Sequence, residues 1–167
     1  LNVNNAASIG SEADATTGFA ASGSLLTSES SVTNGSSFAI KVETNTTPAS
    51  TGRAYIDLKT EFGLVDGNKV IISFDWRHVG TGGGWRIDVG ATSSSTGSPM
   101  VQAINTDTTF ASYTETFDYT DAATRFFVMR EFSGTDDGGV YLDNLSIKST
   151  SHGANVDGVK YFDTLNG

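Results

Sequence analysis

Two segments in the middle of the chain alternate charged side chains with apolar ones. The charged positions are Asp75 and Arg77 in the first segment and Arg86 and Asp88 in the second. Because side chains alternate between the two faces of a strand, each pair predicts a strand with one apolar and one charged face. If the two strands are neighbours, the four charged side chains share a face. Such a face pairs with sugar hydroxyls, and its arginines also bind carboxylate or sulfate groups.

The same four side chains fit a second interpretation equally well, an exposed ladder of opposite charges worth a few tenths of a kcal/mol per pair. Aromatic side chains extend the binding hypothesis, because pyranose rings stack on them. The alternation along its segment places Trp76 on the core-facing side. Trp85 follows a glycine-rich stretch and is the best stacking candidate if it lies at an edge of the sandwich. The candidate ligand-binding residues are Tyr55, Asp57, Asp75, Arg77, Trp85, Arg86 and Asp88.

Other acids have the spacing of cation ligands. Glu12 and Asp14 are two residues apart, so on an extended segment both point to one side and can converge on a hard cation; an exposed acidic loop is the alternative. Asp143 lies in the alternating segment 138–148, between leucine and isoleucine residues, where a bare carboxylate is costly to bury. We expect Asp143 either to meet a cation or to point to solvent.

The sequence offers few groups of residues that could act together in catalysis. The two histidines, His78 and His152, accompany no Gly-x-Ser-x-Gly motif, and the absence of cysteine argues against a zinc site of Cys and His ligands. A polysaccharide lyase using His78, Arg77, Arg86 and Tyr55 is the sharpest enzyme alternative, and paired carboxylates for glycoside hydrolysis also stay open. We expect no enzyme activity.

Composition narrows the class of partner. The net charge of −9 with ten scattered Lys and Arg disfavours nucleic acid, and no apolar run has the length of a membrane span. With no cysteine, disulfides contribute no stability. Short runs of β-branched and aromatic residues predict strands near 38–42, 54–59, 70–79, 85–89, 100–105, 113–119, 125–132 and 138–148, with a hairpin connection at 80–84. The predicted class is all-β.

Three segments resemble one group of proteins. The closing segment Val140-Tyr141-Leu142-Asp143-Asn144-Leu145-Ser146-Ile147 is similar to the last strand of the calcium-containing β-sandwich carbohydrate-binding modules of families 4, 9, 16 and 22. Residues 12–19 resemble the opening segment of this group, and residues 34–42 its glycine-serine turn and following strand. Together they bracket nearly the whole chain.

This resemblance implies a two-sheet antiparallel β-sandwich, a jelly roll, that binds polysaccharide without catalysis. It also implies a structural calcium with carboxylates from Glu12, Asp14 and Asp143 and carbonyl oxygens near Ser36 and Ser37. We expect a monomeric module over residues 1–149, with 150–167 packing back on it or starting a linker. The expected setting is a secreted polysaccharide-degrading enzyme whose catalytic domain the module accompanies. A purely structural or adhesive module is the remaining alternative.

Overall fold

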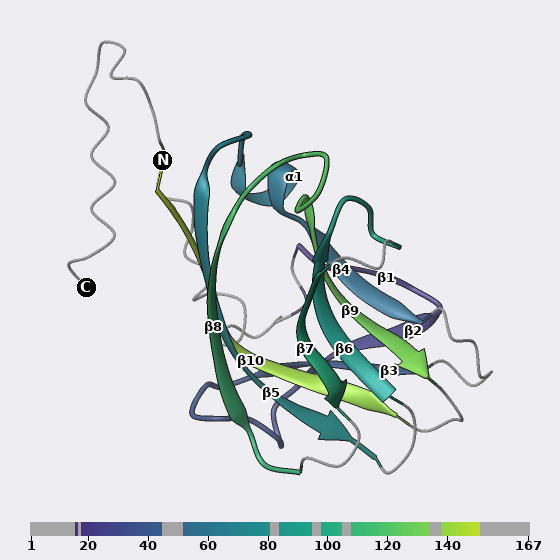
Figure 1. Cartoon of the computed structure of the whole chain (residues 1–167). Helices are drawn as coiled ribbons and strands as arrows, with labels where there is room; N and C mark the ends of the chain where they lie inside the picture. Colours follow the sequence, from purple (N-terminus) through teal and green to yellow (C-terminus); the bar gives the residue numbers. More distant parts are fainter. Residues whose placement is uncertain are drawn as a thin grey trace.

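The chain folds into two five-stranded antiparallel sheets that pack face to face, as Figure 1 shows. The computed structural model describes residue 16 and residues 18–44, 52–80, 84–94, 98–104, 108–133 and 138–150. One short helix, α1, lies at one end of the two sheets. The predicted all-β sandwich is therefore confirmed.

The first sheet, called sheet A, has the strand order β1-β4-β9-β6-β7. Its strands are β1 (Ala20–Ser22), β4 (Arg53–Asp57), β9 (Phe126–Ser133), β6 (Gly84–Gly90) and β7 (Ser98–Ile104). Sheet B has the order β2-β3-β10-β5-β8. Its strands are β2 (Ser24–Glu29), β3 (Ala39–Thr44), β10 (Gly139–Thr150), β5 (Lys69–Val79) and β8 (Ala111–Asp118).

The core lies between the sheets and follows the predicted alternation. On β5, Ile72 and Phe74 are buried, and on β6, Trp85 and Ile87 are fully buried. Sheet B is centred on β10, whose Leu142 and other apolar residues face sheet A. The strand with the most distinctive sequence pattern thus holds the middle of its sheet.

Two elements were not expected. Half of the residues of strand β2 are Ser or Thr, so its sequence shows little alternation of apolar and polar residues. The strand is only partly buried. Helix α1 (Leu58–Phe62) continues directly from β4, with Asp57 as N-cap and Gly63 in the left-handed conformation at its end. The alternating pattern of 54–59 hid this change, because Leu58 is buried in either conformation.

The glycine-rich connection after β5 is not a hairpin, and this prediction was wrong. Both edges of β5 are already paired, one with β10 and the other with β8. The chain therefore crosses to sheet A, where β6 pairs with β7 and β9. Within the described residues, no helix is long and apolar enough to cross a membrane.

Candidate functional site

Three arginines form a row across the outer face of sheet A. Arg53 on β4 lies directly opposite Arg130 on β9, and Arg130 lies directly opposite Arg86 on β6. Directly opposed residues on antiparallel strands share a face, and neighbouring strands are about 4.8 Å apart, so the row spans about 10 Å. Three of the ten Lys and Arg residues of an acidic chain are thus concentrated on one line. We call this feature the arginine row.

Asp88 balances part of this charge from within the sheet surface. Its side chain is 0% exposed, and its Oδ2 accepts hydrogen bonds from Arg86 Nε at 2.8 Å and Arg130 Nε at 2.7 Å. Both arginines approach through Nε, so Asp88 does not engage their terminal nitrogens. Arg86 Nη2 is buried and has no hydrogen-bond partner among the described residues. Asp88 therefore fixes the two guanidinium groups without occupying all of their donors.

Aromatic side chains flank the row on the same face. Tyr55 and Phe126 are half-buried and meet edge to face, with ring centroids 6.0 Å apart. Arg125 lies over the Phe126 ring at 5.2 Å from its centroid. On β9, Val128 lies between Phe126 and Arg130, directly opposite Tyr55, and is fully buried. The outer face of sheet A thus combines guanidinium donors with partly exposed rings.

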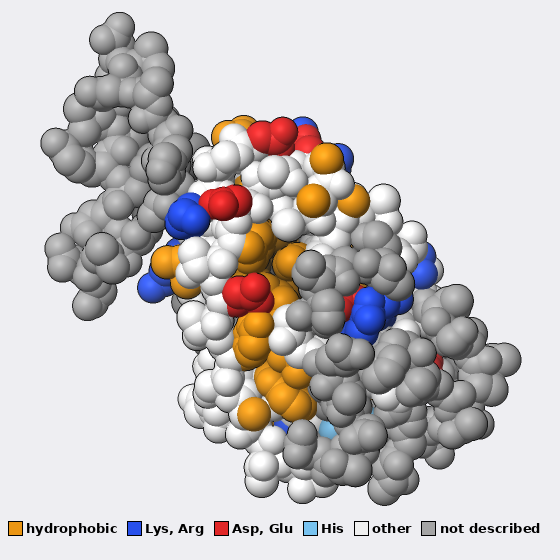
Figure 2. All heavy atoms as spheres, viewed as in Figure 1, with side chains coloured by type: hydrophobic (Ala, Val, Ile, Leu, Met, Phe, Trp, Pro, Cys, Tyr) orange, Lys and Arg blue, Asp and Glu red, His pale blue; other side chains and the backbone are white. Residues whose placement is uncertain are grey.

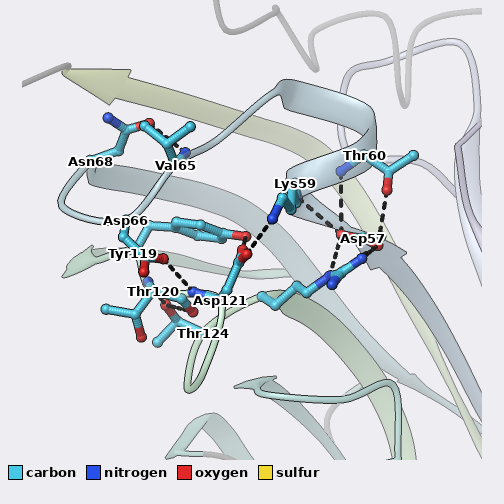
Figure 3. A network of polar contacts seen from close by, with 11 residues as sticks. Asp57, Lys59, Thr60, Val65, Asp66, Asn68, Tyr119, Thr120, Asp121 and Thr124 are labelled. Carbon is cyan, nitrogen blue, oxygen red and sulfur yellow. Dashed lines mark hydrogen bonds and ion pairs between the residues drawn. The ribbon is translucent and has the colours of Figure 1, made fainter. Parts of the chain in front are cut away.

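Asp57 lies on this face but is engaged in the fold, as Figure 3 shows. Its carboxylate caps α1 by accepting from the backbone N–H of Lys59 and Thr60, and it accepts from Arg125 Nη2 at 2.7 Å. Burial raises the pKa of the Asp57 carboxyl, but hydrogen bonds from Arg125 and Thr60 outweigh this effect and hold it below its ordinary value of 3.8. Asp57 is thus occupied by structural contacts.

Replacement of Asp57 by alanine should lower the free energy of unfolding by about 1–2 kcal/mol, because α1 loses its N-cap. The lowered folded-state pKa makes this contribution present above pH 3.8 and lost as pH falls through the folded-state value. Urea unfolding at pH 7 and at acidic pH measures it. We expect the gap between Asp57→Ala and wild type to shrink in acid, and a pH-independent gap would contradict this account.

The same end of the molecule carries a second group of contacts in Figure 3. Tyr119 is fully buried and donates its hydroxyl to Asp121 Oδ1 at 2.5 Å, and Lys59 pairs with Asp121. The backbone N–H of Asp121 donates to Asp66 Oδ1 at 2.7 Å. These contacts join α1, the turn before β5 and the segment after β8 at one end of the sandwich.

Asp75 and Arg77 lie on the outer face of sheet B, away from Arg86 and Asp88. The prediction of one face shared by these four residues was wrong, because β5 and β6 belong to different sheets. Arg77 lies over the Tyr141 ring, 5.1 Å from its centroid. The exposed-ladder interpretation also fails for Asp88, since an exposed charge pair does not have a fully buried carboxylate.

Trp85 does not reach either surface. Its side chain is 0% exposed and belongs to the core, so its proposed role in sugar stacking is contradicted. Trp76 packs against the core but stays half-buried. The alternation thus gave the correct side of the strand for Trp76, whereas the glycine-rich neighbourhood of Trp85 was misleading.

Asp143 is buried under the loop between β2 and β3. It is 1% exposed, so the expectation that it points to solvent is wrong. Its carboxylate accepts from Asn34 N at 2.5 Å, Ser36 Oγ at 2.5 Å and Asn144 N at 2.7 Å. Asn144 has a positive φ of 50° at a bulge in β10, which turns its backbone N–H towards Asp143. We call this arrangement the loop clamp.

Asp75 belongs to the same network. It lies directly opposite Asp143, and like charges so placed repel. Two amides relieve the repulsion, because Asn34 Nδ2 and Asn144 Nδ2 donate to Asp75 Oδ2 at 3.0 and 2.7 Å. Burial raises the pKa of Asp75, yet hydrogen bonds from Ser112, Asn144 and Asn34 leave it lowered. Asp75 thus anchors the loop.

The predicted metal ligands are only partly within the described residues. Glu12 and Asp14 lie outside them. Ser36 and Asp143 are brought together as predicted, although Ser36 contributes its hydroxyl rather than a carbonyl oxygen. The described part of the chain contains no group of three His, Cys, Asp or Glu side chains close enough to hold a metal ion. Oxygen donors of this kind suit calcium chemically.

The residues suggested for a lyase do not form one site. His78 is 1% exposed and faces the interior, where its Nδ1 lies 3.1 Å from the Gly80 carbonyl oxygen. Arg77 is on sheet B, whereas Arg86 and Tyr55 are on sheet A. This catalytic constellation is therefore contradicted.

Sequence reasoning missed Arg53 and Arg130. Arg53 adjoins a predicted strand beside Ala54, and Arg130 lies within a predicted strand after Met129, so both could be placed on strands. What was not readable is that β4, β9 and β6 are neighbours although they are far apart in the chain. The row exists only through that pairing.

Comparison with solved structures supports the fold. The chain resembles the CBM22-1 xylan-binding domain from Paenibacillus barcinonensis Xyn10C at 13% identity, with a TM-score of 0.57 and coverage of 84% of this chain and 90% of that domain. It also resembles the CBM22-1–GH10 part of Clostridium thermocellum xylanase 10B, complexed with xylohexaose, at 16% identity and a TM-score of 0.58. That match covers 83% of this chain but 27% of the xylanase structure.

A third similar structure is a CBM29-2 variant complexed with mannohexaose, at 12% identity and a TM-score of 0.52, covering 80% of this chain and 82% of that one. No family model and no curated protein matches the sequence. At such low identities the likeness establishes the β-sandwich fold.

Proposed function

We propose that this chain is a non-catalytic module that binds an anionic polysaccharide through the outer face of sheet A. The observation that carries this proposal is the arginine row, in which Arg53, Arg130 and Arg86 occupy directly opposed positions on three strands. Placing like charges opposite one another costs stability. A ligand with carboxylate or sulfate groups offsets that cost when it binds.

The neighbouring aromatic pair suits the rest of such a ligand. Tyr55 and Phe126 present partly exposed rings on which the C–H face of a pyranose stacks. The guanidinium groups of the row bind the acidic substituents, with Asp88 fixing their orientation. The similar structures include xylan-binding and mannohexaose-bound modules, which favours a polysaccharide as the ligand class.

Further parts of the proposal concern the setting of the module. One of the similar structures joins such a module to a GH10 module, and an attached polysaccharide-degrading domain is our proposal for this chain as well. Binding then raises the local concentration of the catalytic domain on its substrate. Polysaccharides of this kind are extracellular, so we propose a secreted protein that acts as a monomeric module.

We also propose a structural calcium near the loop clamp. Asp143 and Ser36 are the described residues that would hold it, together with Glu12 and Asp14. When bound, the cation would neutralise these carboxylates and tie the two ends of the chain together. Asp143 already accepts three hydrogen bonds, which stabilise its charge independently of a metal.

Affinity electrophoresis tests the binding proposal. Polygalacturonate, alginate and a sulfated galactan should each be compared with a neutral xylan and a neutral mannan in the same gel. We expect an anionic polymer to retard the wild-type protein, and Arg130→Gln to reduce its affinity about tenfold or more through loss of hydrogen bonds to a charged group. Lys69→Gln is the matched control, because Lys69 is an exposed cation on sheet B.

The outcomes separate the competing functions. Retardation without release of reducing ends or unsaturated products supports a binding module, whereas such products would establish an enzyme. If a folded sample binds none of these polymers, the module is structural or adhesive and the proposal fails. Equal losses of affinity in Arg130→Gln and Lys69→Gln would contradict the placement of the binding face on sheet A.

A further inference from the structure

A band of partly exposed aromatic side chains runs along the open side of the sandwich. In the described residues, β7 and β8 are the last strands of their sheets, and Figure 1 shows them on the same side. Figure 2 shows hydrophobic side chains at the surface between them. Trp76, Tyr113 and Phe117 are half-buried and pack against the core from this side. We call these three residues, together with Glu115, the edge band.

Glu115 breaks the pattern of β8. Positions 113, 115 and 117 share the face that packs on the core, where Glu115 lies opposite the fully buried Ile72. An apolar residue would complete the core at this position, yet the chain has a half-buried carboxylate there. Its Oε2 accepts a hydrogen bond from the Tyr113 hydroxyl at 2.6 Å. The carboxylate is thus held in place beside the aromatic rings.

The Tyr113 ring is also fixed. It stacks on Phe74, with ring centroids 5.3 Å apart and an interplanar angle of 28°. Burial and the hydrogen bond to Glu115 raise the pKa of the Tyr113 hydroxyl to about 12, so it stays a neutral donor. A rigid ring, a neutral hydroxyl and a carboxylate therefore lie together, half-buried, on the core-facing side of β8.

We propose that the edge band is a second carbohydrate site, separate from the arginine row, which takes a neutral sugar. Aromatic rings bind the apolar face of a pyranose, and the Tyr113 hydroxyl oxygen and the Glu115 carboxylate accept hydrogen bonds from its hydroxyls. The negative charge of the Glu115 carboxylate repels acidic sugars. The two sites differ in charge, so they select different parts of a mixed polysaccharide or different polymers.

An inward-facing charge on an edge strand has a competing explanation, since it also prevents strands of different molecules from pairing. That explanation accounts for Glu115 but not for the partly exposed ring of Phe117 next to it, nor for that of Trp76 further along the same side. The two explanations make different predictions for the Glu115→Gln variant. Under the competing one, the variant aggregates while its interaction with sugars is unchanged.

Tryptophan fluorescence tests the proposal directly, because Trp85 is fully buried and Trp76 is half-buried in the edge band. Cellohexaose, xylohexaose and mannohexaose are the probes. We expect at least one of them to shift or quench the emission saturably, and Trp76→Phe to remove this response. Tyr113→Phe and Glu115→Gln should each weaken binding roughly tenfold, while Thr114→Ala, on the exposed face of the same strand, should not.

Arg130→Gln separates this site from the proposed function, because it removes a residue of the arginine row and leaves the edge band intact. A response that persists in Arg130→Gln supports an independent site. The proposal is overturned if none of the three hexasaccharides alters the emission of a folded wild-type sample. It is also overturned if Glu115→Gln aggregates but binds as the wild type does, or if the response is lost in Arg130→Gln alone.

Discussion

The Asp88→Asn variant should unfold with a free energy about 3–5 kcal/mol lower than that of the wild type. Asp88 is fully buried and accepts hydrogen bonds from Arg86 and Arg130, whose side chains are only 13% and 14% exposed. Without its charge, two neighbouring guanidinium groups repel each other with little solvent to screen them. Urea unfolding monitored by circular dichroism measures the loss.

Asp118→Asn is the matched control. Asp118 also pairs with a basic residue, Lys69, but its side chain is 71% exposed. Exposed pairs contribute little, so we expect a change below about 1 kcal/mol. Sulfate gives a second readout: it should raise the melting temperature of Asp88→Asn more than that of Asp118→Asn, because the anion binds the uncompensated arginines. A stability of Asp88→Asn equal to that of the control would show that the row needs no counter-charge.

The Asp143→Ala variant should lose about 2–4 kcal/mol of unfolding free energy. Its carboxylate satisfies two backbone N–H groups, from Asn34 and Asn144, and the Ser36 hydroxyl. An unsatisfied buried donor costs about 1–3 kcal/mol, and the exposed loop recovers part of that cost by reaching water. Amide hydrogen exchange of residues 30–38 should accelerate in the variant. Unchanged protection there would contradict the clamp.

Chelation distinguishes the clamp from the proposed calcium. If calcium contributes, EDTA lowers the melting temperature of the wild type, calcium restores it, and Asp143→Ala responds weakly to both. If EDTA leaves the wild type unchanged while Asp143→Ala remains destabilised, hydrogen bonds alone hold the loop, and the calcium proposal fails. Magnesium serves as the control cation, because it accommodates this kind of irregular oxygen site poorly.

Much of the fold was predictable because local alternation reports burial directly. The inward residues of β5 and β6 were assigned correctly from parity alone, including Ile72, Phe74 and Ile87. Parity does not reveal which strands are neighbours, since that depends on pairing between distant segments. The predicted hairpin between β5 and β6 failed for this reason, as β5 has partners on both sides.

The candidate site was predicted only in part, and the reason is the same. Tyr55, Arg86 and Asp88 were identified and lie on the outer face of sheet A, but Arg53 and Arg130 join them through pairing of β4, β9 and β6. The burial of Asp88 was also beyond a pattern argument, because alternation placed it on the outer face of sheet A without showing that its carboxylate is fully buried there. Asp57 was predicted to bind ligand, but in the structure its carboxylate caps helix α1.

Isothermal titration calorimetry with a matched pair of ligands tests the central claim most directly. An anionic polysaccharide that retards the protein is compared with the same polymer after its carboxylates have been reduced or its sulfates removed. We predict about tenfold or greater preference for the charged form, weakened by salt and lost when Arg53 and Arg130 are both replaced by glutamine. Equal affinity of the wild type for the two forms would contradict the assignment of the arginine row as a site for acidic sugars.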